Sequence, residues 1–137
     1  MTCRWLRSAS LLAFLVLALA PSLALANGSY SHIHISQLAV EELPPGPIQT
    51  LLSDPLYAPM MEAGSMFPDS GYAIESPYGE EAHWPPFVRA YQEWLTERYQ
   101  GDFSSVEAKQ NLAFFLGLVS HGVADQTYDT MMLARSE

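Results

Sequence analysis

The sequence is poor in cysteine and in basic residues. Its 137 residues include one cysteine, Cys3, which excludes a disulfide framework and a zinc site built from thiolates. Beyond residue 26 the chain carries 4 basic against 15 acidic residues, a net charge of −11. Such a surface would repel nucleic acid over most of its area, so nucleic acid is not the expected partner. Bound divalent cations would locally offset the same charge.

The first 26 residues have the pattern of a secretory signal peptide. They contain its parts in order: basic residues near the start, an apolar run at residues 11–19 (LLAFLVLAL), and a small-x-small cleavage site at residues 24–26. A membrane anchor is the alternative, but the run is short beside the roughly 20 residues of a spanning helix. We therefore expect cleavage after Ala26, one mature domain over residues 27–137, and a secreted or periplasmic protein.

The mature part of the sequence indicates an all-α domain. Apolar residues recur at helical spacing, and prolines and glycines mark where helices end. We expect helices over residues 32–42, 48–53, 85–99 and 105–134, with a brief turn at residues 57–61. Residues 63–85 show no sustained period and hold several glycines and prolines, so they predict a long loop. The aromatic residues of this loop argue against disorder, and we expect a metal to tie it to the domain.

The most informative stretch is residues 111–129 (NLAFFLGLVSHGVADQTYD), which is apolar but carries three potential metal ligands. His121, Asp125 and Asp129 are spaced four apart, which places them on one face of a helix. The residues between the first two are small or apolar, so the helix is suited to burial. Burying a carboxylate without a partner costs several kcal/mol. This face therefore predicts a bound cation, and zinc accepts imidazole nitrogen and carboxylate oxygen.

Each candidate ligand has a simpler explanation when taken alone. Asp69 follows a proline and is typical of a turn residue. His83 fits a loop histidine, and His121 fits a histidine satisfied within a core. Asp125 and Asp129 fit a solvated helix face. The combination is what favours a metal site, because these residues fall in an apolar helix or in segments rich in glycine and proline.

Two further histidines lie close to the predicted mature start. His32 alone is typical of a surface histidine. His34 would point in another direction from the same helix, so we expect that the two do not share one metal.

Three motifs together resemble a known family. They are residues 64–70 (GSMFPDS), 82–87 (AHWPPF) and 115–125 (FLGLVSHGVAD). In order and spacing they resemble the zinc-dependent phospholipase C family, and most nearly the N-terminal catalytic domain of glycosylphosphatidylinositol phospholipases D. More distantly they are similar to zinc-dependent single-strand nucleases. The resemblance covers about residues 27–133 and implies an all-α domain that holds up to three zinc ions in a cleft.

The resemblance also implies roles for particular residues. The mature N-terminal residue of the family ligates zinc through its amine and carbonyl, five residues before the first histidine ligand. Asn27 stands five before His32, which implies that these two bind one zinc. The resemblance implies that Asp69, His83 and His121 bind a second zinc, that Asp125 bridges the two ions, and that Asp69 is the general base.

The third zinc of the family is incomplete in this sequence. Asp129 stands where the nearest relatives have histidine, and carboxylate can replace imidazole as a zinc ligand. The family's further ligands lie beyond Glu137. We therefore expect two zinc sites, a domain that is incomplete at its C-terminus, and uncertain activity for this chain alone.

The implied function is hydrolysis of a phospholipid phosphodiester, of phospholipase C or D type. Close zinc ions can polarise a phosphodiester oxygen and lower the pKa of a bound water, which acts as nucleophile, toward about 7. A phospholipid or glycosylphosphatidylinositol substrate would imply contact with a membrane surface. The loop aromatics, including Tyr72, Tyr78 and Trp84, would then meet lipid or would simply pack the loop. Two alternatives stay open: an inactive metal-binding remnant of the family, and a single-strand nuclease.

Overall fold

The computed structural model describes residues 29–132, and these form six helices and no strand. The helices are α2 (Ser29–Glu42), α3 (Pro47–Ser53), α4 (Ala58–Ala73), α5 (Tyr78–Ala82), α6 (Pro85–Tyr99) and α7 (Val106–Met132). The prediction of an all-α domain is confirmed. The predicted signal peptide and Asn27 lie outside the described residues.

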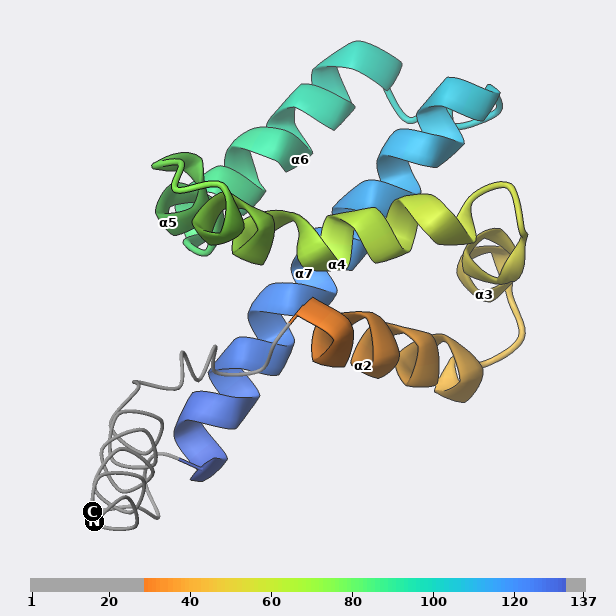
Figure 1. The fold of residues 1–137 in the computed structure, drawn as a ribbon. Coiled ribbons are helices and arrows are strands. Elements are labelled where there is room, and N and C mark those ends of the chain that lie inside the picture. Colours follow the sequence, from red (N-terminus) through yellow and green to blue (C-terminus); the bar gives the residue numbers. More distant parts are fainter. Residues whose placement is uncertain (1–28, 133–137) are drawn as a thin grey trace, which may run out of the picture.

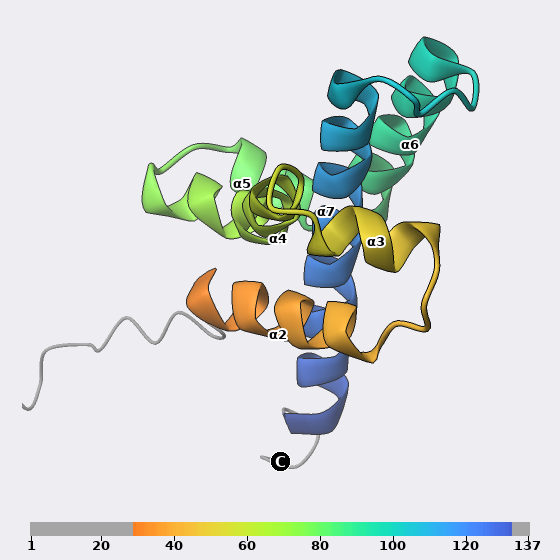
Figure 2. The same ribbon diagram turned by 90° about the vertical axis from the view of Figure 1, so that its right-hand side faces the viewer.

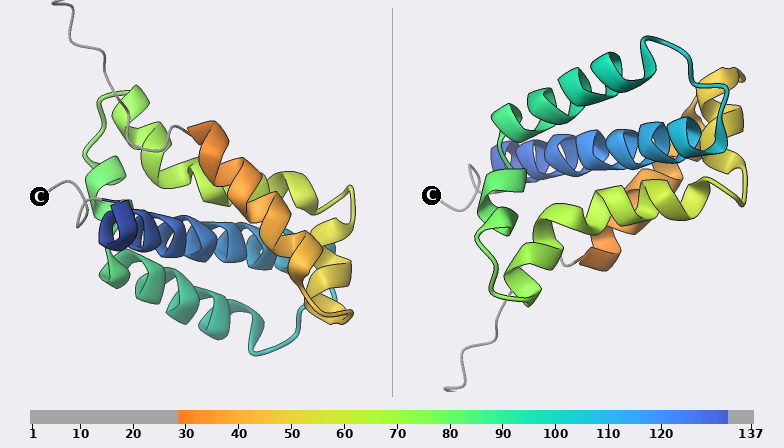
Figure 3. Two further views of the ribbon diagram at one scale, coloured as in Figure 1. Left: turned by 90° about the horizontal axis from the view of Figure 1, so that it is seen from below. Right: turned by 90° about the horizontal axis from the view of Figure 1, so that it is seen from above.

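Helix α7 is the axis of the molecule. Its 27 residues make a rod roughly 40 Å long at 1.5 Å per residue. Figures 1 and 2 show this rod running through the structure, and Figure 3 shows α6 on one side with α2 and α4 on the other. The helix begins after Ser105, whose Oγ accepts the Ala108 N–H at 3.1 Å and so caps the first turn.

Helix α4 packs on α7 with direct contact between the two backbones. A Cβ added to Gly117 would overlap the Met61 carbonyl oxygen and come within 2.8 Å of the Ser65 nitrogen. A Cβ added to Gly64 would in turn overlap the Phe114 carbonyl oxygen. The two glycines therefore permit the crossing that brings the C-terminal half of α4 over His121.

The prediction of a long loop at residues 63–85 is wrong. Most of it is helical, because α4 continues to Ala73 and α5 follows at Tyr78–Ala82. Pro68 lies inside α4, where it removes one backbone hydrogen bond but is buried. Residues that break an isolated helix are tolerated here because the packing against α7 compensates for their low propensity.

A tight turn joins α4 to α5. Gly71 and Gly79 lie backbone to backbone, and the Ser76 N–H donates to the Gly71 carbonyl at 2.9 Å. Side chains at these two glycines would force the helices apart. The turn therefore places His83, which follows α5, beside Asp69 near the end of α4.

The hydrophobic core lies where α2, α3 and α4 pack against the first half of α7. It contains Val40, Leu52, Tyr57, Met61 and Ala113. Where α2 meets α7, the Ser36 and Ser120 hydroxyls lie 2.8 Å apart and satisfy each other. None of the helices between residues 29 and 132 is long and apolar enough to cross a membrane.

Candidate metal centre

Five potential metal ligands from four segments meet on one side of α7. His32 comes from α2, Asp69 from α4, His83 from the end of α5, and His121 and Asp125 from α7. Their ligand atoms form two groups, His32–His121–Asp125 and Asp69–His83–His121, and within each group all atoms lie within 4.8 Å of one another. His121 is common to both groups. The structure thus brings together all the described residues that were expected to hold the first two zinc ions.

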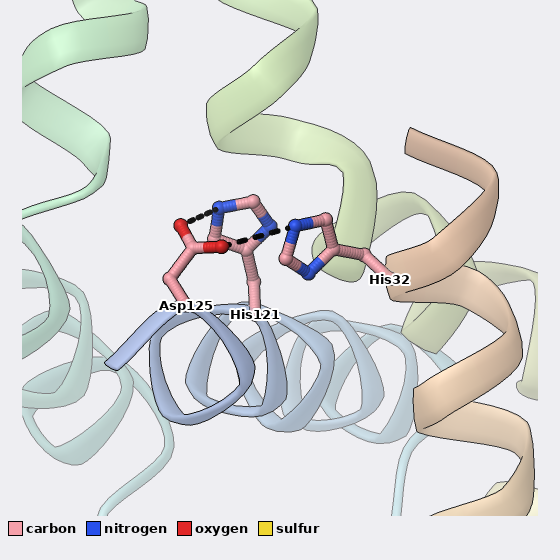
Figure 4. A group of neighbouring side chains, drawn as sticks. All are labelled: His32, His121 and Asp125. Carbon is pink, nitrogen blue, oxygen red and sulfur yellow. Dashed lines mark ion pairs between the residues drawn. The ribbon is translucent and has the colours of Figure 1, made fainter. Parts of the chain in front are cut away.

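The Asp125 carboxylate lies at the edge of the two stacked histidine rings of the first group, with one oxygen near each ring. His32 Nε2 is 3.2 Å from Asp125 Oδ1, and His121 Nε2 is 3.1 Å from Asp125 Oδ2. The ring centroids of His32 and His121 are 3.9 Å apart. Figure 4 shows the carboxylate reaching from α7 toward both rings, with His32 entering from α2.

The second group is linked to the first by the carboxylates. His83 Nε2 lies 3.4 Å from Asp69 Oδ1 and 3.8 Å from Asp125 Oδ2. Asp69 Oδ2 lies 3.8 Å from His32 Nε2. Both carboxylates therefore face histidines of both groups, which is the arrangement that two neighbouring cations would need.

Unpartnered nitrogen atoms show that the residues fit a metal. Both ring nitrogens of His32 and Nε2 of His121 are buried and make no hydrogen bond in the described structure. Although the Asp125 oxygens are close, these contacts lack hydrogen-bond geometry. Buried polar atoms without partners are costly. A cation would satisfy them, and imidazole with carboxylate is a donor set that zinc accepts.

Two backbone carbonyls orient the histidines. His121 Nδ1 lies 2.8 Å from the Ser65 carbonyl oxygen, and His83 Nδ1 lies 2.6 Å from that of Gly79. A carbonyl can only accept, so each Nδ1 carries the proton and leaves Nε2 free for a metal. Such outer partners typically fix the ring of a metal-binding histidine. Sequence reasoning missed both carbonyls, because a backbone acceptor has no residue-type signal.

The surroundings of His121 favour its neutral form. Burial lowers its pKa from the ordinary value, and the nearby His32 lowers it further, while the hydrogen bond to Ser65 opposes the shift. A neutral imidazole is the form that binds a metal.

Two other candidates, Asp129 and His34, belong to neither of these groups. Asp129 is exposed one turn beyond Asp125 and is a member of neither group. His34 is exposed whereas His32 is 1% exposed, so the two side chains have different surroundings. Asn27 lies outside the described residues.

A cavity of about 600 Å³ opens beside the metal-binding groups. His83 and Asp125 form part of its wall, and apolar residues of α6 and α7 form much of the rest. Asp129 lies at the same cavity. A small phosphate-containing group could therefore reach the ligands from solvent.

Glu80 fixes two aromatic side chains at this cavity. Its carboxylate accepts the Tyr72 hydroxyl at 2.7 Å and the Trp84 indole N–H at 2.9 Å. These hydrogen bonds lower the pKa of Glu80, and the bond to Glu80 raises the pKa of Tyr72 to about 12. Sequence reasoning named both aromatics but missed Glu80, which lies in the segment that was expected to be a loop.

Comparison with known proteins identifies the family. Residues 31–128 match the family described as zinc dependent phospholipase C. The chain belongs to this family. The match includes all five clustered ligands.

Curated relatives are phospholipases of one type. The chain is 39% identical over 77 residues to the phosphatidylinositol-glycan-specific phospholipase D of Dictyostelium discoideum, a match that covers 53% of the chain and 8% of the relative. It is 32% identical over 76 residues to that of Bos taurus, covering 51% and 9%. For Mus musculus the values are 30% over 81 residues, covering 55% and 10%. The match thus spans a tenth or less of these relatives. No solved structure matches the chain.

Proposed function

We propose that this chain, a member of the zinc dependent phospholipase C family, is a secreted phosphodiesterase domain. It would act on phospholipids as an enzyme of phospholipase C or D type. The observation that carries the proposal is the pair of ligand groups that share His121, with the Asp125 carboxylate between them. Two adjacent cations are a recurrent device for phosphodiester cleavage. The names of the curated relatives support a phospholipid or glycosylphosphatidylinositol substrate.

The ligand assignment has one ion in each group. His32 and Asp125 would hold one zinc and Asp69, His83 and His121 the other, and Asp125 lies near histidines of both groups, where it would bridge the two ions. His121 can serve only one ion through Nε2, since its Nδ1 is bonded to Ser65. We assign it to the ion of Asp69 and His83, which leaves a coordination position on the His32 side for Asn27.

The chain's own residues supply binding, orientation and a base. Zinc, when bound, supplies Lewis acidity toward the phosphate and lowers the pKa of water to about 7. Asp69 is the proposed general base: its side chain is 19% exposed, so it is accessible to water while it faces the ligand histidines. Its Oδ1 faces His83 and its Oδ2 faces His32, so one oxygen can stay oriented while the other takes a proton.

A side-by-side assay tests this function. The secreted protein is given phosphatidylcholine, phosphatidylinositol or single-stranded DNA, each with zinc and with a chelator. The proposal expects zinc-dependent lipid hydrolysis and little cleavage of DNA, because the net charge of −11 beyond residue 26 repels it. Diacylglycerol as product identifies a C-type enzyme and phosphatidic acid a D-type enzyme.

The assay also separates the two alternatives. DNA cleavage in preference to lipid hydrolysis would replace the proposal with a single-strand nuclease. Zinc binding without hydrolysis of any substrate would replace it with an inactive metal-binding remnant. Asp69→Asn serves as the internal control, since it should abolish hydrolysis by removing the base.

Secretion forms part of the proposal and has its own test. Cleavage after Ala26 would make Asn27 the N-terminal residue and free its amine, five residues before His32. N-terminal sequencing of the secreted protein should therefore return Asn27 first. A start several residues away would contradict the terminal zinc ligand.

A further inference from the structure

Two exposed aromatic side chains stand at the cavity beside the metal-binding groups. Trp84 is 57% exposed and Tyr72 is 45% exposed, and both line the cavity that reaches Asp125. We propose that Tyr72 and Trp84 form a docking surface for a zwitterionic phospholipid membrane. This inference rests on the proposed function, and it adds that the protein binds its lipid substrate within a membrane.

The chemistry of the pair suits a lipid–water interface. Indole and phenol rings combine an apolar body with a polar tip, and they concentrate at the headgroup level of membranes. Glu80 accepts a hydrogen bond from each polar tip. The polar atoms are thus satisfied by the protein, and the exposed ring surfaces remain for a partner.

Glu80 also prepares the pair for docking. A surface that is already ordered loses less conformational freedom when it binds. The Tyr72 hydroxyl and the Trp84 indole N–H both donate to the Glu80 carboxylate, at 2.7 and 2.9 Å. The rings are therefore held together before a membrane arrives.

The position of the pair fits the proposed reaction. The Tyr72 ring centroid lies 5.1 Å from that of His83, so the docking surface adjoins the metal-binding groups. The phosphodiester of a bilayer lipid lies at the headgroup level, which is the depth that tryptophan and tyrosine favour. Docking by these rings would bring that phosphate toward the cavity.

Charge restricts the kind of membrane. Glu80, Asp125 and Asp129 line the cavity together with one basic residue, Arg89, and the chain as a whole carries a net charge of −9. An anionic lipid surface would be repelled, most strongly at low salt. A zwitterionic surface such as phosphatidylcholine avoids this repulsion, so the proposal commits to it.

Single-tryptophan variants provide the test. All variants carry Trp5→Phe, so that processing of the N-terminus does not affect the signal. Adding Trp94→Phe leaves Trp84 as the reporter, and adding Trp84→Phe leaves Trp94. Trp94 is the matched control, because it is 42% exposed but lies outside the cavity wall. Each zinc-loaded variant is titrated with phosphatidylcholine vesicles and with phosphatidylglycerol vesicles.

The proposal expects a response at Trp84 alone. Its emission should move to shorter wavelength on phosphatidylcholine and be quenched by brominated acyl chains, while Trp94 stays unchanged. Binding to phosphatidylglycerol should be weaker and should recover with salt. Trp84→Ala should lower the partition coefficient about tenfold, because one large apolar side chain no longer inserts.

Three results would overturn the proposal. They are no response at Trp84, equal responses at both positions, and a Trp84 shift that follows protein concentration without vesicles, which would indicate contact between copies. Hydrolysis of a dispersed short-chain phospholipid by the Trp94→Phe variant is measured in parallel. Hydrolysis without a Trp84 response defeats docking alone, whereas a response without hydrolysis defeats the proposed function.

Discussion

At the scale of single residues, Asp125 is the carboxylate on which the two ligand groups converge. Its two oxygens lie 3.2 and 3.1 Å from ring nitrogens of histidines on different helices. Asp129, one turn further along the same helix, is exposed and belongs to neither group. The two residues share type and helix but differ in what surrounds them.

The first prediction compares amide variants at these positions. Asp125→Asn should weaken zinc binding by at least about tenfold, because ligand and near-ligand changes commonly cost that much. Asp129→Asn should leave the affinity nearly unchanged. Competition with a fluorescent zinc chelator measures both. Equal losses in the two variants would contradict the bridging role of Asp125.

The spacing of His121 and Asp125 made two of the five clustered ligands predictable. Two ligands four apart on an apolar helix must share a face, whatever the rest of the fold does. Asp69 and His83 are 38 or more residues away in sequence from His121, so spacing alone could not place them there, and their assignment came from the resemblance. The stacking of His32 on His121 depends on how α2 crosses α7, which no local pattern encodes.

At the scale of elements, the crossing of α4 over α7 positions Asp69 and the Ser65 carbonyl. The amphipathic helices α2 and α6 were predictable from their hydrophobic period. Helix α4 was missed because Gly64, Pro68 and Gly71 have low helix propensity, and their advantage appears only in contact with another helix. In this segment, helix-breaking residues indicate close packing between helices rather than a loop.

The second prediction tests this crossing with two substitutions on one helix. Gly117→Ala should destabilise the protein by about 1–3 kcal/mol, because its Cβ would overlap the Met61 carbonyl oxygen. Gly122→Ala meets nothing within 4 Å and should be neutral or stabilise by up to about 1 kcal/mol. Urea unfolding in excess zinc measures both. Similar free energies of unfolding for the two variants would refute the close crossing.

At the scale of the whole molecule, the metal-binding groups join helices that are distant in sequence. His32 lies on the first described helix and Asp125 on the last, with Asp69 and His83 between them. A metal that binds the folded chain and not the unfolded one adds its binding free energy to the stability. Zinc should therefore stabilise the fold as well as serve as a cofactor.

The third prediction concerns removal of zinc. Zinc at a hundredfold excess over its Kd stabilises by about 2.7 kcal/mol per site, so chelation should lower Tm by roughly 10 °C or more in a domain of this size. In the His83→Ala variant, chelation should lower Tm by only part of this amount, because His32, His121 and Asp125 are the ligands that remain. In the His34→Ala variant, which changes an exposed histidine, chelation should lower Tm as much as in the unmodified protein. An unchanged Tm after chelation would contradict the prediction that zinc stabilises the fold.

The most direct test of the central claim is a count of zinc ions. Native mass spectrometry of the secreted protein, after dialysis against a small excess of zinc, gives the number retained per chain. The account predicts two ions in the unmodified protein and fewer in His121→Ala, since His121 would be a ligand of the ion that Asp69 and His83 hold. A protein that retains no zinc, or a His121→Ala variant that retains as much as the unmodified protein, would contradict it.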